Sequence, residues 1–228
     1  MTDPIPYLRL LFLLPPLLAS AYLYWRWCGQ KIEIGYATLR MLVQLIIIGY
    51  ILVVLFQNHS SWVGLLILVI MIVMSTFIGV RPFRDKGAFR WALFSIFLSG
   101  TIILGLVLVG VLDQSPIYQP KVAIPLAGMI YSNSMNTISL AGERYFTELD
   151  NDHSKIEARA ASYKAALIPQ INSFLAVGLV SLPGMMTGQI LSGVSPLIAV
   201  RYQIMVMAMV MGSAGLSAGF FLWLQSKK

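Results

Sequence analysis

The chain has 228 residues, of which 58% are hydrophobic and 11% are charged, and its formal net charge is +7. Because soluble domains carry roughly 25% charged residues, this composition excludes an ordinary soluble domain and indicates one membrane domain over residues 1–228. The basic residues stand in short loops between apolar stretches, which is typical of membrane topology signals and argues against a nucleic-acid-binding protein.

Four apolar stretches in the first half of the chain approach the length of about 20 residues that a membrane-spanning helix needs. We expect spans at 7–25, 35–56, 62–80 and 91–112. Pro15 and Pro16 should kink the first of them, because proline interrupts the helical hydrogen-bond ladder. We expect this stretch to be an uncleaved span and not a signal peptide, since Arg9 is its only early basic residue and its apolar character continues to Trp27.

The fifth expected span, at 122–141, is the most polar. On a helix, small and polar side chains gather within an arc of roughly 100°, and they are Gly128, Ser132, Met135, Asn136, Ser139 and Glu143. The opposite side carries Ile124, Leu126, Ile130 and Ile138. Two interpretations stay open: the polar face packs against other helices, since small residues let backbones approach, or it lines a substrate pathway.

Residues 143–164 form a long hydrophilic segment that holds five of the nine acidic residues and has no glycine or proline. We expect a cytoplasmic helical element here. A span at 165–182 follows, with Gln170 and Asn172 inside it, and Pro183 and Gly184 should end it. The corner at 183–196 is either a loop or a re-entrant segment.

The last expected span begins near Pro196, because proline suits a first helical turn, and ends near Leu224. One face of it should contact other helices through small residues, namely Ala208, Gly212, Gly215 and Gly219. Four alternating methionines, at 205, 207, 209 and 211, split between two faces of a helix, so apolar packing explains them better than a soft-metal site.

The positive-inside rule predicts the orientation of the spans. The loops at 26–31, 81–90 and 143–164 and the carboxyl terminus hold 12 of the 16 basic residues. Arg9, Lys121 and Arg201 remain for the other side, and Arg40 is expected to snorkel to the nearby interface. We therefore predict an all-α polytopic bundle of about seven spans, with the amino terminus outside and the carboxyl terminus inside.

The motifs of several protein classes are missing from the sequence. It has no phosphate-binding loop of the G-x-x-x-x-G-K-[ST] type, no Ser/His/Asp arrangement and no metalloprotease helix motif. The single cysteine, Cys28, and the two histidines exclude an internal disulfide and a Cys/His zinc cluster. Nothing indicates an enzyme or a resident cofactor, so a transporter, a transport subunit or a membrane assembly factor remains.

Five short motifs recur in one known family, and they are Ile124-Pro-Leu-Ala-Gly-Met-Ile, Asn133-x-Met135, Ala166-Leu-Ile-Pro169, Val180-Ser-Leu-Pro-Gly-Met-Met-Thr-Gly188 and Arg201-Tyr-Gln-Ile-Met205. With them the chain resembles the FetB family of ABC transporter permeases, which are implicated in iron export and have plant relatives linked to aluminium tolerance. The resemblance implies a permease in a bacterial inner membrane that works with a separate ATP-binding subunit. Family members carry a longer cytoplasmic segment, with a Leu-Gly-Ala signature, before the Ala-Leu-Ile-Pro motif, and this chain lacks that signature.

We expect a homodimer, because seven spans with one polar stripe enclose little space on their own. The expected pathway residues are Ser132, Asn133, Asn136, Ser139, Gln170 and Asn172, and the expected residues for coupling to the ATPase are Glu143, Glu148, Glu157 and Arg159. No metal-ligand set is predicted, since only Glu143 supplies a charge near the stripe. The alternatives are a self-sufficient ion channel or secondary transporter, and a non-transporting membrane assembly factor.

Overall fold

The computed structural model describes residues 6–30, 32–58, 61–83, 85, 87–116 and 118–227, and every named element in it is helical. This confirms the predicted all-α, polytopic fold class. The helices are α1 (Tyr7–Leu10), α2 (Leu14–Cys28), α3 (Glu33–Asn58), α4 (Ser61–Gly79), α5 (Ala88–Gly105), α6 (Pro120–Asp150), α7 (Lys155–Ala176), α8 (Gly184–Leu191) and α9 (Pro196–Ser226). The chain divides into two compact units, residues 1–58 and 59–228.

The first unit shows the predicted interruption of the first span. A short 3-10 turn, η1 (Leu11–Leu13), separates α1 from α2 directly before Pro15 and Pro16. Proline has no backbone N–H, so the preceding carbonyl groups lack their usual partners and the chain winds more tightly there. The α2 helix ends at Gly29, whose φ of 74° is left-handed, and Tyr24 Oη then donates a hydrogen bond to Glu33 Oε2 at the start of α3.

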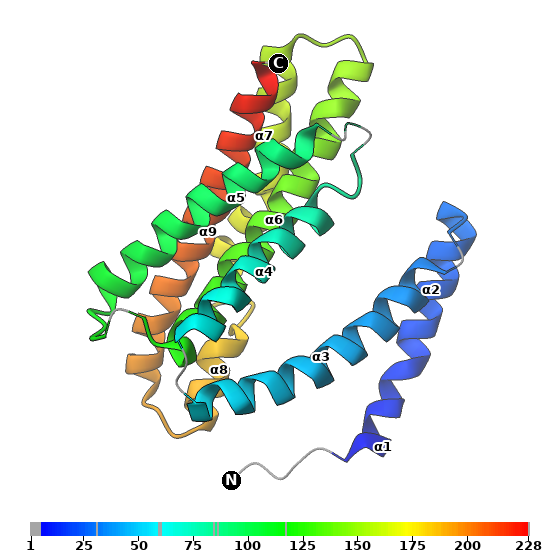
Figure 1. The fold of residues 1–228 in the computed structure, drawn as a ribbon. Coiled ribbons are helices and arrows are strands. Elements are labelled where there is room, and N and C mark those ends of the chain that lie inside the picture. The colour runs from blue at the N-terminus through cyan, green and yellow to red at the C-terminus, as the bar shows by residue number, and fades with distance from the viewer. Residues whose placement is uncertain are drawn as a thin grey trace. The chain divides into compact units, whose positions relative to one another are not determined.

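The second unit is a bundle of α4 to α9 in which α6 and α9 are the longest helices (Figure 1). The α6 helix packs against α4, α5, α7 and α9, and α8 packs against α9. Fully buried apolar side chains from α5, α6 and α9 form the core, among them Ile96, Ile130, Ile138, Phe221 and Leu222. The α5 helix continues into a π-helical turn, η2 (Leu106–Val111), at its carboxyl end.

Five of the described helical segments are long and apolar enough to cross a membrane, and they are Leu8–Cys28, Glu33–Val53, Trp62–Gly79, Ala88–Val111 and Pro196–Ser226. They coincide with five of the seven predicted spans. The other two predicted spans lie within α6 and α7, whose serine, asparagine and charged residues lower their hydropathy. The count of seven spans and the predicted orientation therefore remain predictions.

Two predicted boundaries are wrong. Only residues 165–176 of the span expected at 165–182 are helical, as part of α7, which begins at Lys155, accommodates Pro169 and ends at Ala176. Pro183 does not end that span but precedes α8 as its N-cap residue. A turn with Gly178 at φ 84° follows α7, and α8 occupies most of the corner between α7 and α9.

The hydrophilic segment at 143–164 is helical as predicted, but it is not a separate element. Its first part continues α6 to Asp150, and its second part begins α7. Residues 151–154 form the turn of a helical hairpin, where Asp152 has a φ of 63°. The hairpin is therefore a direct extension of two helices of the bundle.

Of the regions predicted to share one side of the membrane, the loop at 81–90, the segment at 143–164 and the carboxyl terminus lie at one end of this unit (Figure 1), and the loop at 26–31 belongs to the first unit. Phe83, in the loop between α4 and α5, has its ring 5.6 Å from the rings of Phe146 in α6 and Phe221 in α9. Gln225 Nε2 donates a hydrogen bond to Asp85 Oδ2 at 3.1 Å. Figure 1 shows the carboxyl terminus at the same end as the α6–α7 hairpin. His59, expected to be a solvated loop residue, and Arg84 lie outside the described residues.

Candidate functional site

The predicted polar face of α6 has two edges, and one of them packs against α4. Ser139 Oγ donates a hydrogen bond to the carbonyl oxygen of Gly79 at 2.8 Å. A Cβ atom placed on Gly79 would lie 3.3 Å from the carbonyl oxygen of Met135, and one on Gly128 would lie 3.4 Å from Cε of Met71. Small residues therefore let α4 and α6 approach closely. Ser139, an expected pathway residue, therefore takes part in the contact between α4 and α6.

The other edge of the polar face is exposed. Ser132, Asn136 and Glu143 are exposed along one side of α6, and Thr147 extends the row to the hairpin. Ser132 Oγ donates to the carbonyl oxygen of Met129 at 3.3 Å, whereas the amide of Asn136 makes no hydrogen bond to the part of the chain that the structure describes. Polar groups are costly against hydrocarbon. This edge therefore requires water or a second protein surface.

The apolar side of α6 faces into the bundle. Ile124, Leu126, Ile130 and Ile138, predicted to oppose the polar face, are all buried. A helix that lined a channel within a single bundle would have its polar side inside, and α6 has the reverse arrangement. A pathway along α6 would therefore run outside this bundle, between it and another surface.

Two predicted pathway residues meet between α6 and α7. Gln170 Nε2 donates a hydrogen bond to Asn133 Oδ1 at 3.2 Å, and Asn133 Nδ2 donates to the carbonyl oxygen of Met129 at 2.8 Å. Gln170 is buried, whereas Asn172 is exposed. Side chains two positions apart in an α-helix point in directions about 200° apart. Asn172 therefore lies on a different side of α7 from Gln170. Asn133 and Gln170 thus join two helices, and Asn172 is not part of their contact.

Three of the four residues predicted to form a small-residue contact face on α9 contact two neighbouring helices, whereas Ala208 is exposed and lines a cavity. A Cβ atom on Gly212 would lie 3.2 Å from Cδ1 of Ile103 in α5. On Gly215 and Gly219 it would lie 3.4 Å and 3.7 Å from the side chain of Tyr163 in α7. A further link was not predicted: Ser134 Oγ donates to the carbonyl oxygen of Ser213 at 3.4 Å. The position of Ser213 between Gly212 and Gly215 in the sequence could have indicated that it also contacts a neighbouring helix.

A cavity of about 380 Å³ between the end of α7, α8 and α9 was also not predicted. Its lining is almost entirely apolar and includes Phe174, Met186 and Met207, with Gln203 as the polar exception. Gln203 is only 5% exposed, and its Oε1 has no hydrogen-bond partner within the described chain. The sequence signal for a polar group here is the glutamine inside an apolar helix at Arg201-Tyr-Gln.

Two of the predicted coupling residues stabilise the α6–α7 hairpin itself. Glu148 is buried, and its carboxylate contacts Arg144 and lies 2.6 Å from Nδ1 of His153. Glu157 and Ser154 form a capping box at the start of α7, in which Ser154 N and Oγ donate to Glu157 Oε2 at 3.1 Å and 2.7 Å. The hydrogen bonds from Ser154 lower the pKa of Glu157.

The remaining coupling residues differ in their surroundings. Glu143 is exposed at the base of the hairpin, and Arg159 lines a groove between α7 and α9. His153 was predicted to be solvated; its side chain is half exposed, but it also contacts Glu148. Within residues 6–227 as far as they are described, no three His, Cys, Asp or Glu side chains cluster as metal ligands would.

Comparison with known proteins places the chain among membrane proteins. Residues 8–162 and 157–228 match the family described as "Uncharacterised protein family (UPF0014)". A UPF0014 membrane protein of Synechocystis is 37% identical over 211 residues, which cover 85% of this chain and 81% of that protein. The probable iron export permease protein FetB of Escherichia coli is 34% identical over 205 residues, covering 83% and 78%. Protein ALUMINUM SENSITIVE 3 of Arabidopsis thaliana is 32% identical over 202 residues, covering 82% and 73%.

No solved structure is significantly similar to the chain. The family match consists of two segments that meet at residues 157–162, in the first turns of α7. The alignment with the Synechocystis protein extends over 211 positions, more than the 85% of 228 residues that this chain contributes. The shorter segment before the Ala-Leu-Ile-Pro motif stays a prediction.

Proposed function

This chain belongs to the UPF0014 family of membrane proteins, and we propose that it is the permease subunit of an ABC transporter that exports iron or a related metal ion. The name of the Escherichia coli relative supports this substrate class. The observation that carries the proposal is the exposed polar edge of α6, which a helix surrounded by lipid would not present. The relatives from Synechocystis and Bacillus subtilis support a bacterial inner membrane as its location.

The pathway forms between two copies of the chain that meet through α6. Ser132 and Asn136 of each copy line it within the membrane, and Glu143 stands at the end next to the hairpin. Hydroxyl and amide oxygens suit hard cations. Because these groups are neutral, they replace part of an ion's hydration shell without holding the ion tightly. A partly hydrated or complexed metal ion therefore passes along them.

The pair Asn133 and Gln170 supports this pathway from behind. Their hydrogen bond ties α7 to α6 directly beside the exposed edge, so α6 and α7 move together. Asn172 lies on another side of α7 and is exposed. Asn172 would line the pathway only in a conformation in which α7 turns toward the second copy.

Energy comes from a separate ATP-binding subunit, because the chain has no phosphate-binding loop of the G-x-x-x-x-G-K-[ST] type. The contact for this subunit is the α6–α7 hairpin. Ile156, near the turn of the hairpin, is 71% exposed and offers an apolar anchor next to the polar side chains of Asp152 and Lys155. Glu148 stabilises the hairpin through its contact with His153, and Glu157 does so through its hydrogen bond with Ser154.

The continuity of α6 explains how such a contact would act on the pathway. The helix runs without interruption from Pro120 to Asp150, so the hairpin and the residues Ser132 and Asn136 belong to one rigid element. Closure of the nucleotide-binding subunits would push the hairpin and rotate α6 and α7 together. That rotation would open the pathway along α6 to one side of the membrane and close it to the other.

The proposal is tested with the chain and its ATP-binding subunit, purified together and placed in lipid vesicles. ATP should drive movement of Fe²⁺ across the vesicle membrane, and neither the chain alone nor the ATP-binding subunit alone should do so. ATP hydrolysis by the isolated chain, or directional Fe²⁺ transport without ATP, would refute it.

A membrane assembly protein is the second candidate function. The exposed amide of Asn136 and hydroxyl of Ser132 are also suited to hydrogen bonds with a helix of a different protein. In that case the chain should purify as a one-to-one complex with that partner, and the vesicles should show no ATP-driven transport.

A further inference from the structure

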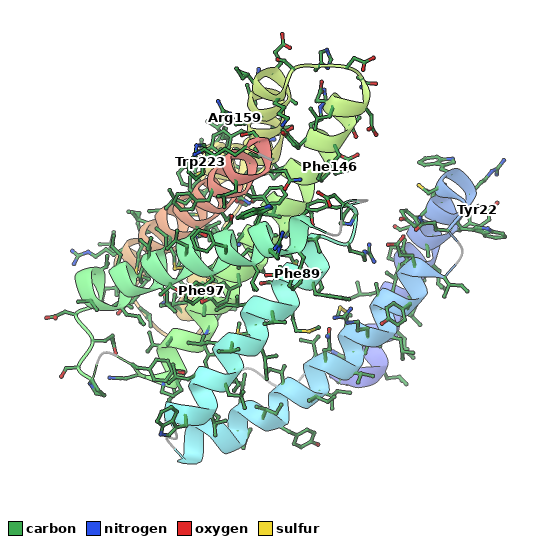
Figure 2. All side chains as sticks on the ribbon, turned by 45° about the horizontal axis from the view of Figure 1, so that its top comes forward. Tyr22, Phe89, Phe97, Phe146, Arg159 and Trp223 are labelled. Atoms are coloured by element: carbon green, nitrogen blue, oxygen red, sulfur yellow. The ribbon has the colours of Figure 1, made fainter. Side chains whose placement is uncertain are left out.

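A groove of about 340 Å³ lies between α7 and α9, at the end of the bundle that holds the hairpin. It is lined by Arg159, Ala160, Tyr163, Gly219, Leu222 and Trp223. Figure 2 shows Arg159 and Trp223 close to each other at this end. No step of the proposed transport function uses this groove, so a binding site here is independent of that function.

The groove exists because α9 presents glycines to α7. Tyr163 lies against Gly215 and Gly219, where added Cβ atoms would be 3.4 Å and 3.7 Å from its side chain. Beyond these glycines no side chain fills the space between the helices, and Trp223 forms the far wall. Tyr163 is part of the helix contact and is also exposed, so its ring reaches the opening.

The groove is electropositive. Arg159 lies one helical turn before Tyr163 and makes no ion pair with any side chain that the structure describes. Lys227 Nζ lies 3.7 Å from the centre of the Trp223 ring, which places a second cation at the rim. None of the six lining residues is acidic. The buried carboxylate of Glu148, on α6, is paired with Arg144 and His153.

The exposed side chains along this side of α9 change in chemical character in the same order as the layers of a membrane surface. Leu216 is 39% exposed, Trp223, two turns later, is 47% exposed, and Lys227 is exposed one turn beyond. An apolar residue, then an aromatic ring, then a cation is the order found from the hydrocarbon to the headgroup layer. The α9 span ends at Ser226, so Trp223 stands at its interfacial end.

We propose that this groove binds the headgroup of an anionic phospholipid. Arg159 and Lys227 contact the phosphate, Tyr163 and Trp223 pack against the glycerol region, and an acyl chain follows α9 past Leu216. Basic pockets between membrane helices commonly hold anionic lipid headgroups. A bound lipid would join α7, which carries half of the hairpin, to the end of α9.

The test uses native mass spectrometry of the detergent-purified full chain. Its probes are phosphatidylglycerol and phosphatidylcholine with identical acyl chains. The wild-type chain should bind phosphatidylglycerol more tightly than phosphatidylcholine. The double variant Arg159→Gln/Lys227→Gln should bind phosphatidylglycerol on the order of tenfold more weakly, because each cation near the membrane surface contributes to anionic lipid attraction. Its affinity for phosphatidylcholine should not change.

Lys164→Gln is the matched control, because it removes one positive charge from α7 at an exposed position that does not line the groove. It should leave phosphatidylglycerol binding unchanged. The charge-conserving variant Arg159→Lys/Lys227→Arg should retain most of the binding, which separates loss of the site from loss of the fold. Soluble glycerol phosphate at the lipid concentration should not displace the lipid.

Three results would overturn the proposal. The wild-type chain could bind both lipids equally. The Lys164→Gln variant could lose as much binding as the double variant, which would indicate a general surface potential. Complete displacement of the lipid by glycerol phosphate would indicate a site for a free phosphate compound.

Discussion

The ring of Phe83 lies directly against the backbone of Gly142: a Cβ atom on Gly142 would clash with Cζ of Phe83. Only a residue without a side chain allows this approach, and it places the loop between α4 and α5 onto α6. The same ring stacks on Phe221 in α9. Phe83 thus joins the loop between α4 and α5 to both α6 and α9 at the end of the bundle next to the hairpin.

We therefore expect Gly142→Ala to destabilise the bundle by about 1–3 kcal/mol, because the new methyl group overpacks the site and displaces Phe83. The measurement is thermal unfolding of the purified chain. Gly105→Ala is the control, since a Cβ atom there meets nothing within 4 Å. An unchanged unfolding temperature in Gly142→Ala would contradict the close contact.

Asn136→Leu tests whether the polar face of α6 packs against other helices or lines a substrate pathway. Because Asn136 is exposed and its amide is not bonded within the described chain, the change should leave unfolding almost unaffected. It should strongly reduce metal-dependent transport or metal-stimulated ATP hydrolysis with the partner subunit, since leucine makes the pathway drier. Normal transport with leucine at position 136 would remove this residue from the pathway.

Ser139→Ala is expected to have the opposite outcome. It removes the hydrogen bond to the carbonyl oxygen of Gly79 and should lower stability by about 0.6–2 kcal/mol. Transport by the folded fraction should be retained. Thermal unfolding and transport are measured on one preparation of each variant, and the reverse pattern would show that Ser139 acts in the pathway.

A double-mutant cycle at Asn133 and Gln170 should reveal a coupling energy of about 0.6 kcal/mol, the average for hydrogen bonds between membrane helices. The cycle consists of Asn133→Leu, Gln170→Leu and the double variant, compared by reversible unfolding in detergent. Additive effects of the two single changes would show that the hydrogen bond does not link α6 to α7.

The capping box should make the hairpin sensitive to acid. Hydrogen bonds from Ser154 lower the folded pKa of Glu157 below its ordinary value of 4.5. A depressed folded pKa contributes stability above the unfolded pKa, and this contribution is lost as pH falls through the folded pKa. The difference in unfolding temperature between wild type and Glu157→Ala should therefore be constant near neutral pH and shrink below pH 4.5. A difference that does not change with pH would contradict this.

Orientation is tested with single cysteines in a Cys28→Ser background. Cysteine at Ser115, in the loop between α5 and α6, should react with an impermeant thiol reagent added outside cells. Cysteines at Ser154 and Ser226, at the opposite end of the bundle, should react only after the membrane is opened. Outside labelling at Ser154 would reverse the orientation predicted from the basic residues.

Much of the fold follows from local patterns in the sequence. Apolar runs of membrane-spanning length predicted the five spans that the structure contains, and Pro15, Pro16 and Pro196 predicted an interruption and a helix start. The failures lie where a proline did not act as expected. Pro183 was expected to end the span at 165–182, but α7 ends at Ala176 and Pro183 precedes α8, because the surrounding helices supply packing that local propensity does not include.

The candidate site was predictable only in part. The sequence placed Ser132, Asn136 and Ser139 on one face of α6, but it did not distinguish the edge that packs from the edge that is exposed. That distinction depends on Gly79, which lies 60 residues from Ser139. The contact of Gln170 with Asn133 also depends on a partner 37 residues away.

The sequence by itself determined that this is an all-helical membrane protein, because bilayer length and helical hydrogen bonding are satisfied within each segment. Only the tertiary structure decided which side of α6 faces its neighbours. In a bilayer the lipid is as apolar as the bundle interior, so burial of apolar side chains does not select a face. Close contacts through residues such as Gly79 and Gly142 make that selection, and they leave Ser132 and Asn136 on the outside of the bundle.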